Sequence, residues 1–389
     1  MTFRHATILL VALVAAADPL DRAQATPATA STREAGQAGA QDSPPAQGRA
    51  AVEALQELLT TLELGLQGRT IELGLPLVAE GGMLAKDGRA VATVARALFQ
   101  AGREAEAEAL LEGARANPET VAWIELEHAW IALQRDELDE ARALLTDPAG
   151  GATPLRHPEL PTAWILLARV QSRAGRLDQG ALFAQRFLEM APLHEEAPSA
   201  WHLLSREAAL RGAGAEAQEL LARSEQLRNW HEVMRVRRLQ VRQSPAEPLP
   251  RLGLALGWMQ VEAWERAELE LEALLELHPD YCRALFHLGE ARRLGGDATG
   301  AIEAYGACVD CDPADMRPRL NRALLLRAAG RNDEALADLL AVTSSEVAQD
   351  PLFLGAHLEL ARALRDADRG EDATAAYDRY RSLGGTEEL

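Results

Sequence analysis

Lysine is almost absent from this chain, since Lys86 is the only one and arginine supplies the other basic side chains. Aromatic residues make up only 4% of the 389 residues, and strand-type alternation of β-branched and aromatic residues is nearly missing, which argues against a sheet. Alanine and leucine dominate the apolar fraction, as is typical of helices. The composition therefore predicts an all-α protein.

Motifs of the common catalytic classes are also missing. The sequence has no G-x-S-x-G, no H-E-x-x-H, no glycine-rich phosphate loop before a helix and no calcium loop, and its nine histidines are scattered. The net charge of −19 argues against a nucleic-acid partner, because phosphate binding needs a cationic surface. We therefore expect a protein that is not an enzyme and binds no cofactor, no metal and no nucleic acid.

The first residues have the pattern of an export signal. The apolar run 6–17 is too short to span a bilayer, and Ala23-Gln24-Ala25 offers a small-x-small cleavage site. We interpret residues 1–25 as a signal peptide, 26–47 as a disordered linker and 48–87 as a helical capping region. The expected location is periplasmic or secreted, with no integral membrane span after signal removal; an uncleaved anchor is the alternative.

One pattern recurs along the rest of the chain and is clearest in residues 282–313 and 319–340. In each copy a small residue, a glycine, an alanine and an apolar or aromatic residue follow one another at fixed distances. The residues are Gly289, Gly296, Ala301 and Tyr305 in one copy, and Ala323, Gly330, Ala335 and Leu339 in the next. Such spacing predicts two antiparallel helices joined by a tight turn.

This pattern resembles the tetratricopeptide repeat, a unit of about 34 residues. The resemblance implies a right-handed superhelical solenoid of antiparallel helix pairs, with a first array over 88–225 and a second over 248–389. Two copies depart from the pattern, because one has Asp136 in place of the turn glycine and another has its glycine displaced to Gly370. The copies are residues 91–118, 122–145, 163–192, 200–221, 248–280, 282–313, 319–340 and 358–380.

The segment 226–247 between the arrays is basic and does not fit the repeat. We predict a connecting helix followed by a linker. Its arginines indicate either a docking patch for an anionic partner or lipid head group, or an extended helix whose arginines pair with neighbouring glutamates. The arginines are Arg228, Arg235, Arg237, Arg238 and Arg242.

The three cysteines, Cys282, Cys308 and Cys311, fall within one copy. An antiparallel pair brings the start of its first helix beside the end of its second, so Cys282 is expected near Cys308 or Cys311. In an exported protein a disulfide is expected there. The alternatives are a zinc site that includes His278, redox chemistry at the C-x-x-C sequence, and a buried set of free thiols.

The resemblance places binding on the face lined by first helices. Arginine recurs there among aromatic residues, whereas the second helices are rich in glutamate, so we predict a cationic groove with apolar pockets. The candidate partner-binding residues are Arg96, Trp123, Trp130, Arg169, Arg206, Arg283, Phe286, Arg293, Arg317, Asn321, Arg327, Arg362 and Arg365.

These residues favour a non-enzymatic scaffold for protein–protein interactions that binds an extended or acidic peptide segment. The partner is expected to be a protein or peptide with acidic or carboxylate features. The alternative is a structural subunit of a cell-envelope assembly or export complex.

Overall fold

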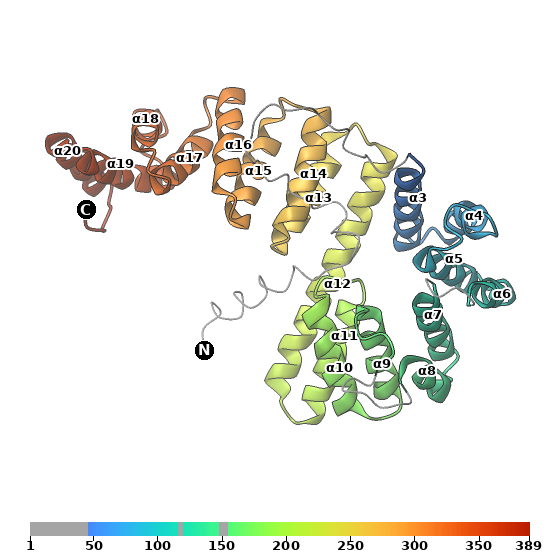
Figure 1. Ribbon diagram of the computed structural model, residues 1–389. Coiled ribbons are helices and arrows are strands. Elements are labelled where there is room, and N and C mark those ends of the chain that lie inside the picture. Colours follow the sequence, from blue (N-terminus) through green and yellow to red (C-terminus); the bar gives the residue numbers. More distant parts are fainter. Residues whose placement is uncertain (1–45, 116–119, 148–154) are drawn as a thin grey trace, which may run out of the picture. The chain divides into compact units, whose positions relative to one another are not determined.

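The computed structural model describes residues 46–115, 120–147 and 155–389, and in these residues the regular structure is helical (Figure 1). The signal peptide and nearly all of the linker expected from the sequence lie outside the described residues. Helices of the first part are α3 (Ala46–Glu63), α4 (Gln67–Val78), α5 (Gly88–Gln100), α6 (Glu104–Ala114), α7 (Val121–Gln134), α8 (Leu138–Leu145), α9 (Pro161–Arg173), α10 (Leu177–Met190), α11 (Ala197–Leu210) and α12 (Gly214–Gln243).

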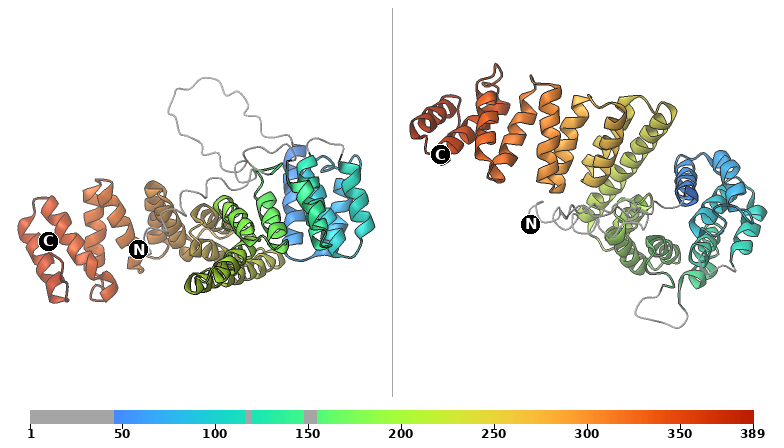
Figure 2. Two further views of the ribbon diagram at one scale, coloured as in Figure 1. Left: turned by 90° about the horizontal axis from the view of Figure 1, so that it is seen from below. Right: turned by 45° about the horizontal axis from the view of Figure 1, so that its top comes forward.

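The second part begins with α13 (Pro248–Gln260) and α14 (Trp264–Leu277). It continues with α15 (Cys282–Gly295), α16 (Ala298–Cys311), α17 (Met316–Ala328), α18 (Asn332–Thr343), η2 (Pro351–Phe353), α19 (Leu354–Asp366) and α20 (Gly370–Ser382). The chain divides into two compact units between Arg235 and Val236. Within the second unit, the pairs from α13 to α20 follow one another in chain order in every view (Figures 1 and 2).

A common turn joins the two helices of each pair. One residue takes a left-handed conformation, and the next N–H donates to a carbonyl near the end of the first helix, as Arg103 does to Leu98 (2.9 Å) and Asp297 to Arg292 (2.8 Å). This Schellman bond satisfies a carbonyl that the helix end leaves open. From α5 to α20 the left-handed residues are Gly102, Asp136, Gly175, Gly212, Glu262, Gly296, Gly330 and Asp368.

Three of these turns do not use glycine, which corrects one sequence-based expectation. The glycine of the last copy was placed at Gly370, but Gly370 begins α20 and Asp368 takes the left-handed conformation (φ 55°). The left-handed conformation therefore keeps its position in the repeat, although the residue there is aspartate and not glycine. The hydrogen bond from Arg369 to Leu364 (2.9 Å) and the packing of the two helices fix the turn at the expense of local strain at Asp368.

Small residues lie where the helices of a pair touch. A Cβ atom added at Gly289 would lie 2.5 Å from the ring of Tyr305, which is fully buried. A Cβ atom at Gly180 would lie 2.9 Å from the carbonyl oxygen of Ala168, which explains why glycine replaces the alanine usual at that position. The two helices can approach each other closely at these points because glycine has no Cβ atom.

The capping region is itself a helix pair. Between α3 and α4, Gly65 takes the left-handed conformation (φ 71°) and the N–H of Leu66 donates to Thr61 (2.9 Å), as in the other pairs. Pro76 does not interrupt α4, which continues to Val78. The linker was expected to reach residue 47, whereas α3 begins at Ala46.

In this added pair the sizes of the contacting residues are exchanged. The first helix carries the large Leu58, which is fully buried, at the position that is small in the other pairs. The second helix carries Gly74 where the others have a larger residue, and a Cβ atom there would lie 3.1 Å from Leu58. Complementary volume is thus retained although the order is reversed.

Helix α12 joins the two units. It continues without interruption from the fourth array pair into the basic segment, so the connecting helix expected over 226–247 is the end of a longer helix, Gly214–Gln243. None of the helices in the described residues is both long and apolar enough to cross a membrane.

Candidate functional site

The cysteines join the two ends of one pair. Cys282 at the start of α15 forms a disulfide with Cys311 at the end of α16, with a Cα–Cα distance of 5.6 Å. Cys308 is a buried free thiol that donates to the carbonyl oxygen of Cys282 (3.3 Å). Burial and the charges of Asp315 and Asp312 raise the pKa of Cys308 to about 11, so this thiol stays protonated at neutral pH.

The zinc alternative does not match this geometry. The His278 Nε2 atom lies 2.7 Å from the carbonyl oxygen of Ala246, and two of the three sulfur atoms are in the disulfide. In the described ranges, the His, Cys, Asp and Glu side chains form no group of three or more that could hold a metal ion.

In the first unit, Arg96 is held by a buried carboxylate. Its guanidinium makes two hydrogen bonds to Glu127 (3.1 and 2.7 Å) and lies 4.9 Å from the ring centroid of Trp130. Burial lowers the pKa of Arg96, but the charge and hydrogen bonds of Glu127 outweigh it and raise the pKa overall. Only 2% of the Glu127 side chain is exposed, so this pair is structural in character.

The other candidates of this unit differ in their contacts. Arg169 pairs with Glu196 (3.1 Å), and Trp123 lies beneath Arg89 at 5.7 Å. Trp130 makes an edge contact with Phe99 and packs against the apolar cores on both sides of it. Arg206 is exposed and forms no hydrogen bond or ion pair with described residues. It is therefore the available cation of this set.

In the second unit, the carboxylate of Glu290 on α15 binds two candidate residues, Arg293 and Asn321, and also Tyr305. It pairs with Arg293 (2.8 Å), accepts a hydrogen bond from the amide of Asn321 on α17 (2.6 Å) and accepts another from the hydroxyl of Tyr305. Burial raises the pKa of Glu290, but these donors outweigh it and lower the pKa overall. Asn321 therefore joins α17 to α15, whereas Arg293 pairs with Glu290 within α15.

The last two pairs form a similar network. Arg327 on α17 pairs with Glu359 on α19 and with Asp366 (3.0 Å). Arg362 binds the same Glu359 (2.8 Å), and Arg365 lies 3.8 Å from Asp366. All three candidate arginines of this region therefore have carboxylate partners.

A different arrangement occurs on α15 and α17. Arg317 lies 5.0 Å from the ring centroid of Phe286 and pairs with Asp315 (2.6 Å). Arg283 is exposed and makes no hydrogen bond or ion pair with described residues. Burial and the charges of Arg283 and Arg317 lower the pKa of His287. We call Arg283, Phe286, His287 and Arg317 the α15–α17 patch.

The turn and the residue spacing recur in every pair from α5 to α20. The small residues Ala255, Gly289 and Ala323 occupy equivalent positions in three consecutive copies and are separated by the repeat length of about 34 residues. The described residues have the fold of a tetratricopeptide-like solenoid of helix pairs.

Comparisons with known proteins add little to this assignment. No family model matches the chain, and no curated protein matches it. Among solved structures, a crystal structure of MamA is 15% identical over 46% of this chain and 93% of its own, with a TM-score of 0.36. MamA from Desulfovibrio magneticus RS-1 is 17% identical over 49% and 96%, with a TM-score of 0.33.

TTC0263, a thermophilic TPR protein of Thermus thermophilus, is 19% identical over 53% of this chain and 99% of its own, with a TM-score of 0.28. At such scores these likenesses carry no argument about function, and the assignment depends on the repeat geometry.

Ion pairs reduce the positive charge that was expected on the face lined by first helices. The first helices also carry glutamates, and Glu127, Glu290 and Glu359 each bind a side chain from a neighbouring first helix. Among the predicted arginines, only Arg206 and Arg283 have no carboxylate partner among the described residues. The positive charge of this face is thus local and not continuous.

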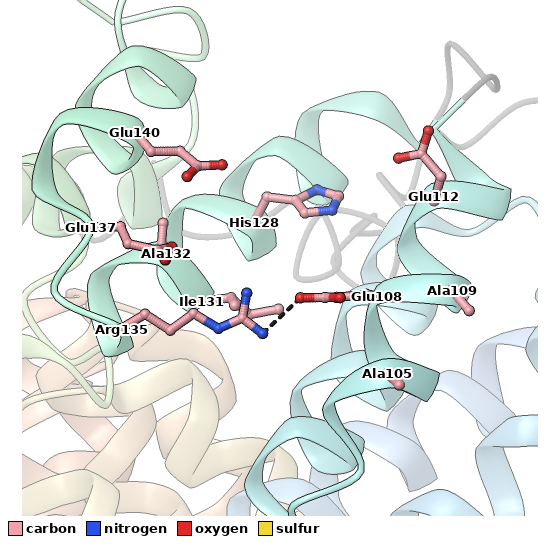
Figure 3. Close-up of a pocket in the computed structure, with 10 residues that line it drawn as sticks. All are labelled: Ala105, Glu108, Ala109, Glu112, His128, Ile131, Ala132, Arg135, Glu137 and Glu140. Atoms are coloured by element: carbon pink, nitrogen blue, oxygen red, sulfur yellow. Dashed lines mark ion pairs between the residues drawn. The ribbon is translucent and has the colours of Figure 1, made fainter.

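A cleft that the sequence analysis did not anticipate lies between α6, α7 and α8 (Figure 3). It has a volume of about 480 Å³, with Ile131 and Ala132 among its apolar lining residues. In Figure 3 Arg135 extends toward Glu108, with which it forms an ion pair of 2.7 Å. Glutamates therefore dominate its charge; they are Glu108, Glu112, Glu137 and Glu140.

Proposed function

We propose that this protein is a non-enzymatic interaction scaffold whose second unit holds an extended acidic segment of a partner protein on the α15–α17 patch. The fold supports this proposal, because stacked helix pairs present side chains from successive first helices to one bound segment.

The carrying observation is the combination of charge and apolar surface in the α15–α17 patch. Arg283 has no carboxylate partner among the described residues, and its guanidinium is available for a fork-shaped contact with a ligand carboxylate. Phe286 offers a partly buried ring beneath Arg317, suited to an apolar side chain next to the acidic group. Burial and, after it, the charges of Arg283 and Arg317 lower the pKa of His287 between them.

The disulfide supports a second part of the proposal, namely that the protein works outside the reducing cytoplasm. Cys282, the first cysteine of the disulfide, directly precedes Arg283. The cross-link therefore anchors the beginning of the patch. Disulfides persist in oxidising compartments, in agreement with a periplasmic or secreted location.

Selection from a random peptide library on the full chain tests this function. We expect the selected peptides to be enriched in aspartate and glutamate, and the double variant Arg283→Gln/Arg317→Gln to lose this enrichment. Arg331→Gln serves as the matched control, because Arg331 is exposed and pairs with Glu334 across one helical turn. Neutral or basic selected peptides, or enrichment that survives the double variant, would contradict the proposal.

A further inference from the structure

The segment 384–389 folds back onto the last helix pair. Gly384 takes a left-handed conformation (φ 95°), and a Cβ atom at Gly385 would lie 2.2 Å from the ring of Tyr380. The N–H of Gly385 donates to the Tyr380 carbonyl (3.0 Å), and Arg381 donates to the carbonyl of Gly385 (2.9 Å). Two consecutive glycines therefore set the path of the residues that follow.

The residues that follow, 386–389, include Glu387 and Glu388 and contact one of the predicted partner-binding arginines. Arg362 on α19 donates to the carbonyl oxygen of Glu388 (3.3 Å) and lies 3.5 Å from the carboxylate of Glu387. The hydroxyl of Tyr377 donates to the Glu387 carbonyl (3.0 Å), and the N–H of Glu387 donates to the hydroxyl of Tyr380 (3.1 Å). Both main-chain and carboxylate groups of an extended acidic stretch are thus recognised.

We propose that α19 and α20 form a second binding site for extended acidic segments, and that residues 386–389 of the chain occupy it as a resident competitor. The inference rests on the proposed function, because it assigns the same ligand chemistry to another part of the second unit. A partner segment with adjacent glutamates takes the place of Glu387 and Glu388 and makes the same contacts with Arg362.

The contacts of the resident segment are weak enough to be displaced. Arg362 is 30% exposed and Glu387 is 68% exposed, so their ion pair is largely screened by solvent. Arg362 also keeps Glu359 as a partner when the segment leaves. We expect the segment to lower the apparent affinity for an external acidic peptide by about three- to tenfold, which corresponds to partial occupancy of the site.

A labelled peptide with the sequence of residues 382–389 is the probe, and its fluorescence anisotropy is measured against the full chain and against a variant that lacks 386–389. We expect the shortened variant to bind the peptide about three to ten times more tightly than the full chain. In the shortened variant, Arg362→Gln weakens binding of the peptide. Arg369→Gln is the control, because Arg369 is on the same pair but binds Asp372.

Equal affinity of the full and shortened chains would overturn the inference, and so would binding that Arg362→Gln leaves unchanged. If the probe fails to bind while library peptides still depend on Arg283, the α19–α20 site is refuted and the α15–α17 patch stands. If neither probe nor library peptides bind, both proposals fail. Circular dichroism of each variant verifies that the helices are intact.

Discussion

The substitution Gly289→Ala tests the packing of the helix pair, because it is expected to lower the free energy of unfolding where a helix-interior glycine-to-alanine change ordinarily raises it. A Cβ atom added there would lie 2.5 Å from two ring carbons of Tyr305 and 3.0 Å from a third. Favourable carbon contacts begin near ~3.5 Å, and the Tyr305 ring is enclosed on all sides. Gly289→Ala therefore forces a packed ring to move.

Two effects on the free energy of unfolding oppose each other in Gly289→Ala. Alanine is better than glycine inside a helix by about 1 kcal/mol. Overpacking costs about 1–3 kcal/mol, and the upper part of this range applies because a shift of Tyr305 also disturbs its hydrogen bond to Glu290. We expect a net loss of about 1–2 kcal/mol.

Urea unfolding of the full chain, followed by circular dichroism and by hydrogen exchange of α15 and α16, measures this loss. The next pair holds Ala323 against Leu339 at the equivalent positions, so Gly289→Ala/Tyr305→Leu recreates a combination that fits. We expect the double variant to lose about 1–2 kcal/mol less than the sum of the single variants. Gly113→Ala, where a Cβ atom meets open space, is the control that gains stability. A comparable gain from Gly289→Ala would refute the reasoning.

Three further predictions concern other parts of the fold. Glu127→Gln leaves the charge of Arg96 without its partner and is expected to lower the free energy of unfolding in urea by about 3 kcal/mol, whereas Arg96→Met/Glu127→Gln costs less; equal losses would argue against a buried ion pair. Glu262→Gly relieves a left-handed residue (φ 60°) and is expected to raise the thermal unfolding temperature, with a gain of about 1 kcal/mol; a decrease would contradict the strained turn. The pKa of Cys308 is raised to about 11 in the folded protein, against about 8.5 in the unfolded chain, so its contribution to stability is complete below about pH 8.5 and is lost toward pH 11; Cys308→Ala should flatten this part of the pH profile.

The helix pairs were predictable because their signals are local. A small residue, a turn residue and an apolar residue at constant spacing determine a hairpin within about 20 residues of chain. The added pair α3–α4 was not recognised as such, because Leu58 and Gly74 exchange the usual order of large and small. A search for complementary volumes, with either order allowed, would have found it.

The charge of the first-helix face was less predictable. Its arginines were visible in the sequence, but their partners lie on neighbouring pairs, and the sequence alone does not specify which side chains face each other across an interface. Arg96 and Glu127 show the difficulty, since each taken alone resembles a solvent-exposed charge. Their separation of 31 positions, close to one repeat, was the available signal.

The contact of residues 384–389 with α19 and α20 was equally hidden. Adjacent glycines such as Gly384 and Gly385 are a common sign of a turn, but they do not say where the following residues go. The destination of the following glutamates depends on the Tyr380 ring, against which Gly385 packs, and a tertiary contact of this kind leaves no periodic signal.

The titration of His287 with and without a saturating acidic peptide tests the proposed binding most directly, because this imidazole lies in the α15–α17 patch beside Arg283 and Arg317. NMR of the histidine ring carbons in the full chain, assigned with His287→Gln, provides the pKa. The account predicts that bound carboxylates offset the charge of both arginines and raise the pKa of His287. An unchanged pKa in the peptide-saturated protein would contradict it.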